Sequence, residues 1–131
     1  MTRFVVDAGV AIQLAAAGIE VSSDHELLAP TLLRSQTLSL LHEAVARGEI
    51  TAEVGLDRHR LISQMPIRLL GDAVLRRKAW QVADRLKWDT TYDAEYVALT
   101  LLQADAFVTM DAELARSVQG IVATASIDDL G

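Results

Sequence analysis

The sequence contains no cysteine among its 131 residues. This absence excludes disulfide bonds, zinc–thiolate sites and catalysis by a thiol. Aromatic residues make up only 5% of the chain, and there are two prolines. The core must therefore be built from leucine, valine, isoleucine and alanine. That composition favours helices packed on a short sheet over an all-β sandwich.

Long hydrophobic runs are also absent. None approaches the roughly 20 residues needed to cross a bilayer, so we expect no membrane-spanning segment. The first residues show no charged region followed by a long apolar segment, so we expect a cytoplasmic protein without a signal peptide. The net charge of −6 argues against tight, passive binding of duplex nucleic acid. It is compatible with a metal-dependent nuclease, because bound cations offset carboxylates locally, and with a basic partner protein.

The apolar pattern predicts strands and helices in alternation within one domain, residues 1–131. The expected strands are 3–6, 67–70, 106–109 and 120–123. The expected helices are 8–18, 30–48 with Pro30 in its first turn, 51–63, 72–87, 92–103 and 111–117, and residues 19–26 are expected to form a polar connection. This order predicts an α/β fold with a short parallel β-sheet flanked by helices, in an α/β/α arrangement.

Three aspartates lie where an apolar stretch ends or a helix begins. Asp7, Asp93 and Asp111 occur in FVVDAG, TTYDAEYVAL and AFVTMDAEL. An aspartate just past a buried strand lies at the carboxyl edge of the sheet, where open α/β sheets bind ligands. Three converging carboxylates would repel one another, and a hard divalent cation with oxygen ligands relieves that repulsion. The pattern therefore predicts a small metal-dependent hydrolase, and among these a nuclease.

Each aspartate also has a purely structural explanation. Asp7 and Asp111 precede predicted helices, and aspartate is a preferred N-cap residue. Asp93 lies three residues after Thr90 in a spacing that resembles a capping arrangement. For any one aspartate alone, capping is at least as good an explanation as catalysis. Thr109 has two interpretations as well, since its hydroxyl can orient a carboxylate or a bound water, or it is an ordinary β-branched strand residue.

The sequence resembles a PIN domain, specifically a VapC-type toxin ribonuclease of a toxin–antitoxin pair, over essentially its whole length. The matching segments are FVVDAGVAI, LLAPTLLRSQTLSLLHEAVARGEI, MPIRLL and TTYDAEYVALTLLQADAFVTMDAELA, and their order carries the resemblance. The resemblance implies a short parallel sheet wrapped by helices, an Mg²⁺ or Mn²⁺ cofactor and the cleavage of RNA. By motif, Asp7 matches the first acid of the family, Asp93 the third and Asp111 the fourth.

The second acid of the family is where this sequence departs. A glutamate usually stands in the setting PxLLxxE, and here PTLLRSQ places Gln36 at that position. Glutamine is a weaker ligand for a hard cation, so metal affinity or rate is expected to drop. Glu43 lies about 10 Å further along the helix and Glu95 should point elsewhere, so we expect neither to replace the missing acid. The alternative left open is a PIN-like protein-binding module with weak or no nuclease activity.

Substrate phosphates need cationic contacts outside the acidic cluster. Arg34, two residues before Gln36, is expected near the mouth of the site. The densest basic run is 76–78, followed by Arg85 and Lys87, and a solvated helix face explains it as readily as RNA binding does. The three histidines are scattered, and we expect them to be exposed or on helix surfaces and not to act as metal ligands or a general base: His25, His42 and His59.

The resemblance also implies a partner. VapC-type toxins are held by a cognate antitoxin whose C-terminal segment lies in a groove, and homodimers are common among them. AIQLAAAGI and TLLRSQTLSLL are apolar enough to form such a groove, or simply to be core. Two other classes fit poorly. A receiver domain needs paired acids after its first strand and a late lysine, and a haloacid-dehalogenase-like phosphatase needs a second aspartate where Gly9 stands.

Overall fold

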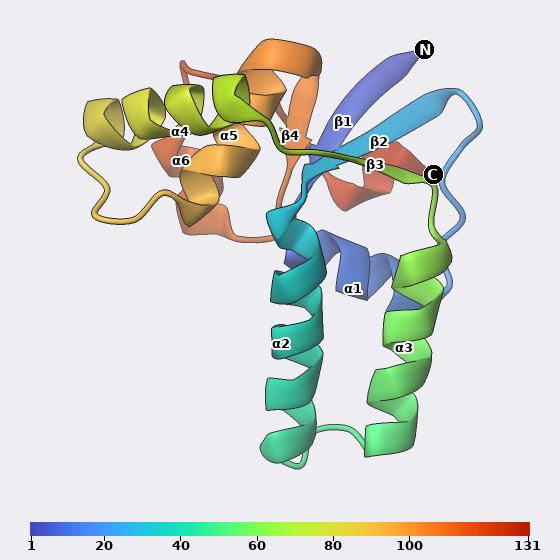
Figure 1. The fold of residues 1–131 in the computed structure, drawn as a ribbon. Coiled ribbons are helices and arrows are strands. Elements are labelled where there is room, and N and C mark those ends of the chain that lie inside the picture. Colours follow the sequence, from blue (N-terminus) through green and yellow to red (C-terminus); the bar gives the residue numbers. More distant parts are fainter.

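A single parallel sheet organises the protein (Figure 1). The structure is a computed structural model that describes residues 1–131. Five strands lie in the order β3-β2-β1-β4-β5, and every neighbouring pair is parallel. The strands are β1 (Thr2–Val6), β2 (His25–Pro30), β3 (Ile67–Leu70), β4 (Ala106–Val108) and β5 (Thr124–Ala125). The predicted α/β class with helices on a parallel sheet is confirmed.

The helices follow the strands in the alternating order that a parallel sheet requires. They are α1 (Ala8–Ala17), α2 (Leu32–Ala46), α3 (Ala52–Gln64), α4 (Ala73–Leu86), α5 (Tyr92–Gln103) and α6 (Ala112–Ser117). A 3₁₀ helix, η1 (Ile127–Leu130), closes the chain. None of the helices combines the length and apolarity needed to traverse a bilayer.

Alternating side chains on the strands separate two apolar cores. On β1, Val5 packs with the larger cluster and Val6 with the smaller one, as the two-residue period of a strand requires. The larger cluster takes in Leu75 of α4 and Leu99 of α5. The smaller one takes in Leu14 of α1 and residues of the C-terminal segment. Both faces of the sheet are therefore covered, and its carboxyl edge is where polar side chains emerge.

Polar N-caps and a glycine in the left-handed conformation delimit several helices. Thr51 caps α3, with its hydroxyl accepting a hydrogen bond from Val54 N at 3.2 Å. Asp72 caps α4 by accepting from Leu75 N at 2.8 Å. After α1 the chain turns through Gly18 at φ 64°, a conformation that glycine adopts without a steric penalty.

Helices α2 and α3 form an antiparallel pair that extends away from the sheet, with α1 crossing beside it (Figure 1). Gly55 allows α3 to approach α2 closely, because a Cβ at this position would lie 3.0 Å from a methyl group of Val45. The pair therefore projects a long face of α2 beyond the carboxyl edge of the sheet.

Two predicted elements are wrong. Residues 19–26 were expected as a connection and Pro30 as the first turn of a helix, yet His25–Pro30 is β2, paired with β1 on one side and β3 on the other. The helix begins only at Leu32, after Thr31. Residues 120–123 were expected as a strand, but they belong to a turn, and β5 is the two-residue strand Thr124–Ala125. At β2, pairing with β1 and β3 overrides the local pattern.

Candidate active site at the carboxyl edge of the sheet

The register of β1 and β4 brings two polar segments side by side. Val6 pairs with Val108 at the ends of these strands. Asp7 directly follows Val6, and Thr109 directly follows Val108. The Thr109 hydroxyl accepts a hydrogen bond from Asp111 N at 3.1 Å, and its proximity to the Asp7 carboxylate lowers the pKa of Asp7. Thr109 thus links the first and the last of the three aspartates, as expected if its hydroxyl orients a carboxylate.

Asp7 is a half-buried carboxylate held by several donors. Its Oδ1 accepts from Val10 N at 2.9 Å, so it caps α1. Burial raises the pKa of Asp7 above the ordinary aspartate value, and the negative charge of Asp111 raises it further. Hydrogen bonds from Thr109 and from the Val10 and Gly9 backbone partly offset that increase in pKa. The charged form of Asp7 is therefore less stable here than in water, and a positive charge nearby would relieve it.

Asp111 also caps a helix. Its Oδ1 accepts from Glu113 N at 3.0 Å and from Leu114 N at 3.1 Å at the start of α6. Its Oδ2 makes no hydrogen bond within the protein. Capping is thus confirmed as one role of Asp7 and Asp111. It leaves the second oxygen of Asp111 available to a ligand.

Asp93 lies in the first turn of α5 and does not cap it. The N-cap residue is Thr91, which makes no side-chain capping bond, and the Asp93 carboxylate has no hydrogen-bond partner in the protein. Partial burial raises the pKa of Asp93, and the charges of Asp111 and then Asp7 raise it further. This mutual repulsion shows that the three aspartates, separated by up to about a hundred positions in sequence, share one region of negative potential.

A pocket of about 340 Å³ opens beside these aspartates. It includes Asp7 and Asp93, while Asp111 lies outside its walls. Gln36 on α2 also lines the pocket, where its Oε1 accepts a hydrogen bond from the Tyr96 hydroxyl at 2.5 Å. The full lining is Asp7, Ala8, Gly9, Gln36, Ser39, Leu40, Glu43, Asp93 and Tyr96. The structure thus brings the predicted Gln36 to the acidic site.

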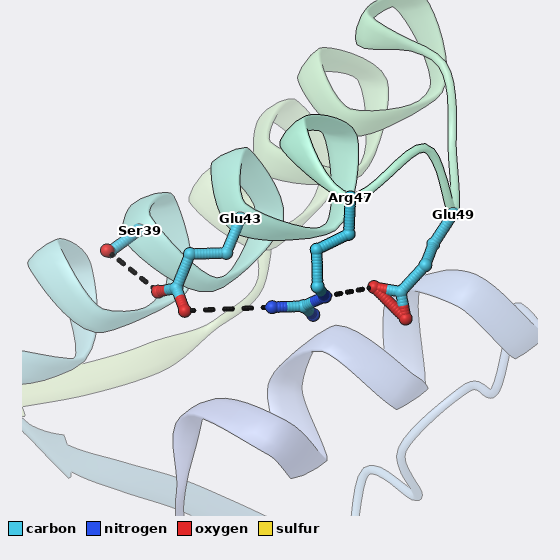
Figure 2. A network of polar contacts seen from close by, with 4 residues as sticks. All are labelled: Ser39, Glu43, Arg47 and Glu49. Carbon is cyan, nitrogen blue, oxygen red and sulfur yellow. Dashed lines mark hydrogen bonds and ion pairs between the residues drawn. The ribbon is translucent and has the colours of Figure 1, made fainter.

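Glu43, which was not expected to replace the missing acid because it lies further along α2, nevertheless lines the same pocket. It does so because the hollow runs along one face of α2 that also carries Gln36 and Ser39. The Glu43 carboxylate accepts from Ser39 Oγ at 3.1 Å and lies 3.8 Å from Arg47, which also pairs with Glu49 (Figure 2). Its negative charge is partly neutralised by Arg47, whereas Asp7 and Asp93 have no cationic partner within 4.0 Å.

Two further residues, Glu95 and Arg34, do not line the pocket. Glu95 is outside it, as expected; burial raises its pKa, and the charge of Arg76 counteracts this. Arg34, expected near the mouth, instead lines a separate cavity of about 450 Å³ between α2, α3 and β3. The contact of the buried Tyr96 hydroxyl with Gln36 had no signal in the local sequence.

The histidines and the basic run also lie apart from the acidic pocket. His42 and His59 line a cavity between α2 and α3, and His25 packs edge-on against Phe4. The basic residues of 76–78, Arg85 and Lys87 lie on α4 or at its end, and none of them forms an ion pair. Because α4 packs on α5, this basic helix adjoins the element that carries Asp93.

The pocket offers carboxylate oxygens, which are suitable ligands for a hard divalent cation. Carboxylate oxygens are the preferred ligands of Mg²⁺ and Mn²⁺. No three acidic or histidine side chains are arranged closely enough to hold a metal ion as a preformed cluster. Mg²⁺ usually retains several waters and is held by one or two carboxylates together with substrate phosphates. Asp7 and Asp93, which both line the pocket, fit that mode of binding.

No protein-family model matches the sequence, and no curated protein does so either. Solved structures do match its fold. PAE2754 from Pyrobaculum aerophilum superposes with a TM-score of 0.78 at 21% identity, covering 98% of this chain and 92% of that one. A chain of VapBC2 from Rickettsia felis, solved with a promoter DNA fragment, gives 0.70 at 5% identity, covering 95% and 98%. A chain of VapBC-1 from nontypeable Haemophilus influenzae gives 0.63 at 12% identity, covering 96% and 98%. The fold is therefore PIN-like.

Proposed function

We propose that this protein is an Mg²⁺- or Mn²⁺-dependent endoribonuclease, the toxin of a type II VapBC-like toxin–antitoxin pair. The observation that carries the proposal is the electrostatic coupling of Asp7, Asp93 and Asp111 at the carboxyl edge of the sheet. Raised pKa values at Asp7 and Asp93 in a pocket are typical of a functional site. The PIN-like fold, shared with chains of two VapBC assemblies, supports the same assignment.

The three aspartates divide the work according to their contacts. A divalent cation bound there would polarise the phosphoryl group and lower the pKa of a water molecule. Asp7, fixed by Val10 N and Thr109, is the rigid cation ligand. Asp93 makes no hydrogen bond in the protein and has a raised pKa, so it is suited to orient the attacking water and accept its proton. The free oxygen of Asp111 completes the negative site from the side of α6.

The RNA backbone requires positive charge outside the pocket. The unpaired basic residues of α4 supply it, because they lie on the helix that packs against α5. An overall net charge of −6 means that binding must be local and cation-assisted, and not a property of the whole surface. Its RNA substrate places the proposed reaction in the cytoplasm.

The proposed protein partner is a cognate antitoxin. On α2, Leu38 and Leu40 are 51% and 41% exposed, although they are large and apolar. Leu38 also lines an apolar cavity of about 210 Å³ between α2 and α3. Leu40 lines the acidic pocket, so an antitoxin segment with an apolar anchor and a basic residue would cover Leu40 and reach the carboxylates. A homodimer is a second assembly compatible with such a face.

RNA cleavage in Mg²⁺ or Mn²⁺ tests the proposed activity. Asp7→Asn should reduce cleavage by about 100-fold or more, because it removes a cation ligand while asparagine still caps α1. Asp72→Asn is the matched control, since Asp72 caps α4 in the same way and lies outside the pocket. If Asp7→Asn cleaves RNA as fast as the parent protein does, the catalytic assignment is wrong.

A second candidate function is a PIN-like protein-binding module with weak or no nuclease activity. Two observations favour it: Gln36 stands where the resembling toxins carry glutamate, and no three-acid cluster is preformed. Gln36→Glu separates the candidates. If the parent protein does not cleave RNA and Gln36→Glu does so with a divalent cation, the natural chain is a binding module.

A further inference from the structure

Only one side chain in the acidic pocket has a hydrogen-bond donor left over. The Ser39 hydroxyl donates to Glu43 Oε2 at 3.1 Å, and the Tyr96 hydroxyl donates to Gln36 Oε1 at 2.5 Å. The charged carboxylates that line the pocket can only accept. The amide NH₂ of Gln36 makes no hydrogen bond to the protein. It is therefore the one uncommitted side-chain donor among the residues that form this pocket.

Tyr96 determines which way the Gln36 amide faces. Its ring is buried, with 2% exposure, and packs against Phe107 at a centroid distance of 6.3 Å, so its hydroxyl is held in place. Tyrosine is protonated at neutral pH and is thus a donor. Burial raises the pKa of Tyr96 further. The carbonyl oxygen of the amide is consequently bound to Tyr96, and the NH₂ group on the same carbon is directed away from that hydroxyl and makes no hydrogen bond to the protein.

The charges around the pocket favour the same orientation. Asp7 and Asp93 make the hollow negative, and a side-chain amide dipole aligns with the field of its surroundings. With NH₂ toward the hollow, the positive end of the dipole faces the carboxylates. With the carbonyl turned inward, its negative end would face them and the Tyr96 hydroxyl would lose its acceptor. Both effects hold Gln36 as a donor and not as a metal ligand.

We propose that Gln36 binds the substrate directly, donating through Nε2 to a phosphate oxygen of the RNA, and that Tyr96 positions the Gln36 amide for this contact. This inference rests on the proposed function of the pocket. Glutamine here replaces an anion with a neutral donor, so the site repels an incoming phosphate less and holds a free cation less tightly. The substitution is therefore a change of role and not only the loss of a ligand.

The test compares two dissociation constants for each variant: that of Mn²⁺ alone, and that of uridine 5′-monophosphate in Mn²⁺, a ligand with no phosphodiester to cleave. Gln36→Met keeps the length of the side chain and removes the amide. It should weaken mononucleotide binding by about tenfold, the usual size for a lost hydrogen bond to a charged group, and change Mn²⁺ affinity by less than about twofold. Gln36→Glu should tighten Mn²⁺ and weaken the mononucleotide.

Tyr96→Phe tests the positioning role. It should weaken mononucleotide binding by about threefold to tenfold, and the double variant with Gln36→Met should bind no worse than Gln36→Met alone, because Tyr96 acts only through the amide. Thermal melts of each variant check that the fold is intact. In RNA cleavage, Gln36→Met should raise KM more than it lowers kcat.

The outcomes separate this inference from the proposed activity. If Gln36→Met weakens Mn²⁺ and mononucleotide binding equally, Gln36 is a metal ligand and the inference is wrong. If the losses of mononucleotide affinity in Tyr96→Phe and Gln36→Met add up in the double variant, Tyr96 does not act through the Gln36 amide. If the parent protein does not bind the mononucleotide, Gln36 does not bind a substrate phosphate. Mononucleotide binding that depends on Gln36 without any Mn²⁺ binding would support the inference and contradict the metal-dependent nuclease.

Discussion

Thr109, one residue past the end of β4, lies beside Asp7, one residue past the end of β1, and its hydroxyl lowers the pKa of the Asp7 carboxylate. The same oxygen accepts from Asp111 N at 3.1 Å. The Thr109 hydroxyl is therefore in contact with the backbone of Asp111 and close to the side chain of Asp7. It also lowers the pKa of Asp7 against the opposing effect of burial. The contact connects sheet register to the charge state of the site.

Replacing Thr109 by valine should raise the pKa of Asp7 further, because a hydrogen bond to the charged form is lost. In the proposed nuclease, the acidic limb of the pH–rate profile should move to higher pH, and the rate near neutral pH should fall by about tenfold, the effect of about 1.4 kcal/mol. Thr100→Val is the control, since it also removes a hydroxyl hydrogen bond, to Tyr96 O, outside the pocket. If the two variants had the same pH–rate profile, Thr109 would have no specific role at the site.

Asp7→Asn should stabilise the protein at neutral pH in the absence of divalent cations. The folded pKa of Asp7 is raised, so between the ordinary value of 3.8 and the folded value the native state binds more protons than the unfolded state. The free energy of unfolding therefore decreases as pH rises through that window, and the penalty is complete above it. Asparagine removes the charge and keeps the cap, so a gain on the order of 1 kcal/mol is expected.

Denaturant melts at several pH values measure this gain. It should be largest near pH 7 and vanish below about pH 4, where Asp7 is protonated in both states. A loss of stability at pH 7 in Asp7→Asn would show that the carboxylate is favourable as it stands and needs no cation.

A divalent cation should raise the melting temperature of the parent protein, because it binds the folded form and not the unfolded chain. Mn²⁺ at 100 times its dissociation constant would add about 2.7 kcal/mol. Asp93→Asn should lose most of this increase, since Asp93 makes no structural hydrogen bond and lines the pocket. Asp84→Asn, on α4, should keep it in full. The same increase in parent and Asp93→Asn would argue against Asp93 as a ligand.

Asp72→Ala should cost about 1 kcal/mol of stability, the usual effect of removing an N-cap. Asp72→Asn should recover most of that loss. Neither change should alter the Mn²⁺-induced rise in melting temperature, because Asp72 lies outside the acidic pocket. Thermal melts with and without Mn²⁺ check both statements, and a reduced cation effect in Asp72→Ala would mean that α4 contributes to the site.

Local chemistry made most of the fold predictable. The segment from β1 through α1 combines a buried apolar run, an aspartate cap and a left-handed glycine at Gly18. The local sequence of strand β2 was misleading. Proline is common in the first turn of a helix, so Pro30 indicated a helix start, and the polar His25 indicated a connection. Only pairing with β1 and β3 fixes it as a strand. Strand β5 is two residues long, and pairing of Thr124 with Phe107 defines it.

The candidate site was predictable where strand ends positioned it and unpredictable where distant helices meet. Asp7 and Asp111 could be placed because parallel strands end at one edge. The contact of Tyr96 with Gln36 joins residues 60 positions apart, and helical periodicity says only that one face of α5 is buried. The elongation of the pocket along α2, which brings Glu43 into its lining, cannot be read from a distance along the helix axis.

X-ray diffraction from crystals grown with Mn²⁺, recorded at the manganese absorption edge, tests the central claim most directly. The expected result is an anomalous peak in the pocket between the carboxylates of Asp7 and Asp93, with Asp111 directed to the same ion or to its water. A pocket without a peak at Mn²⁺ concentrations that support RNA cleavage, or an ion bound elsewhere while these carboxylates point apart, would contradict it.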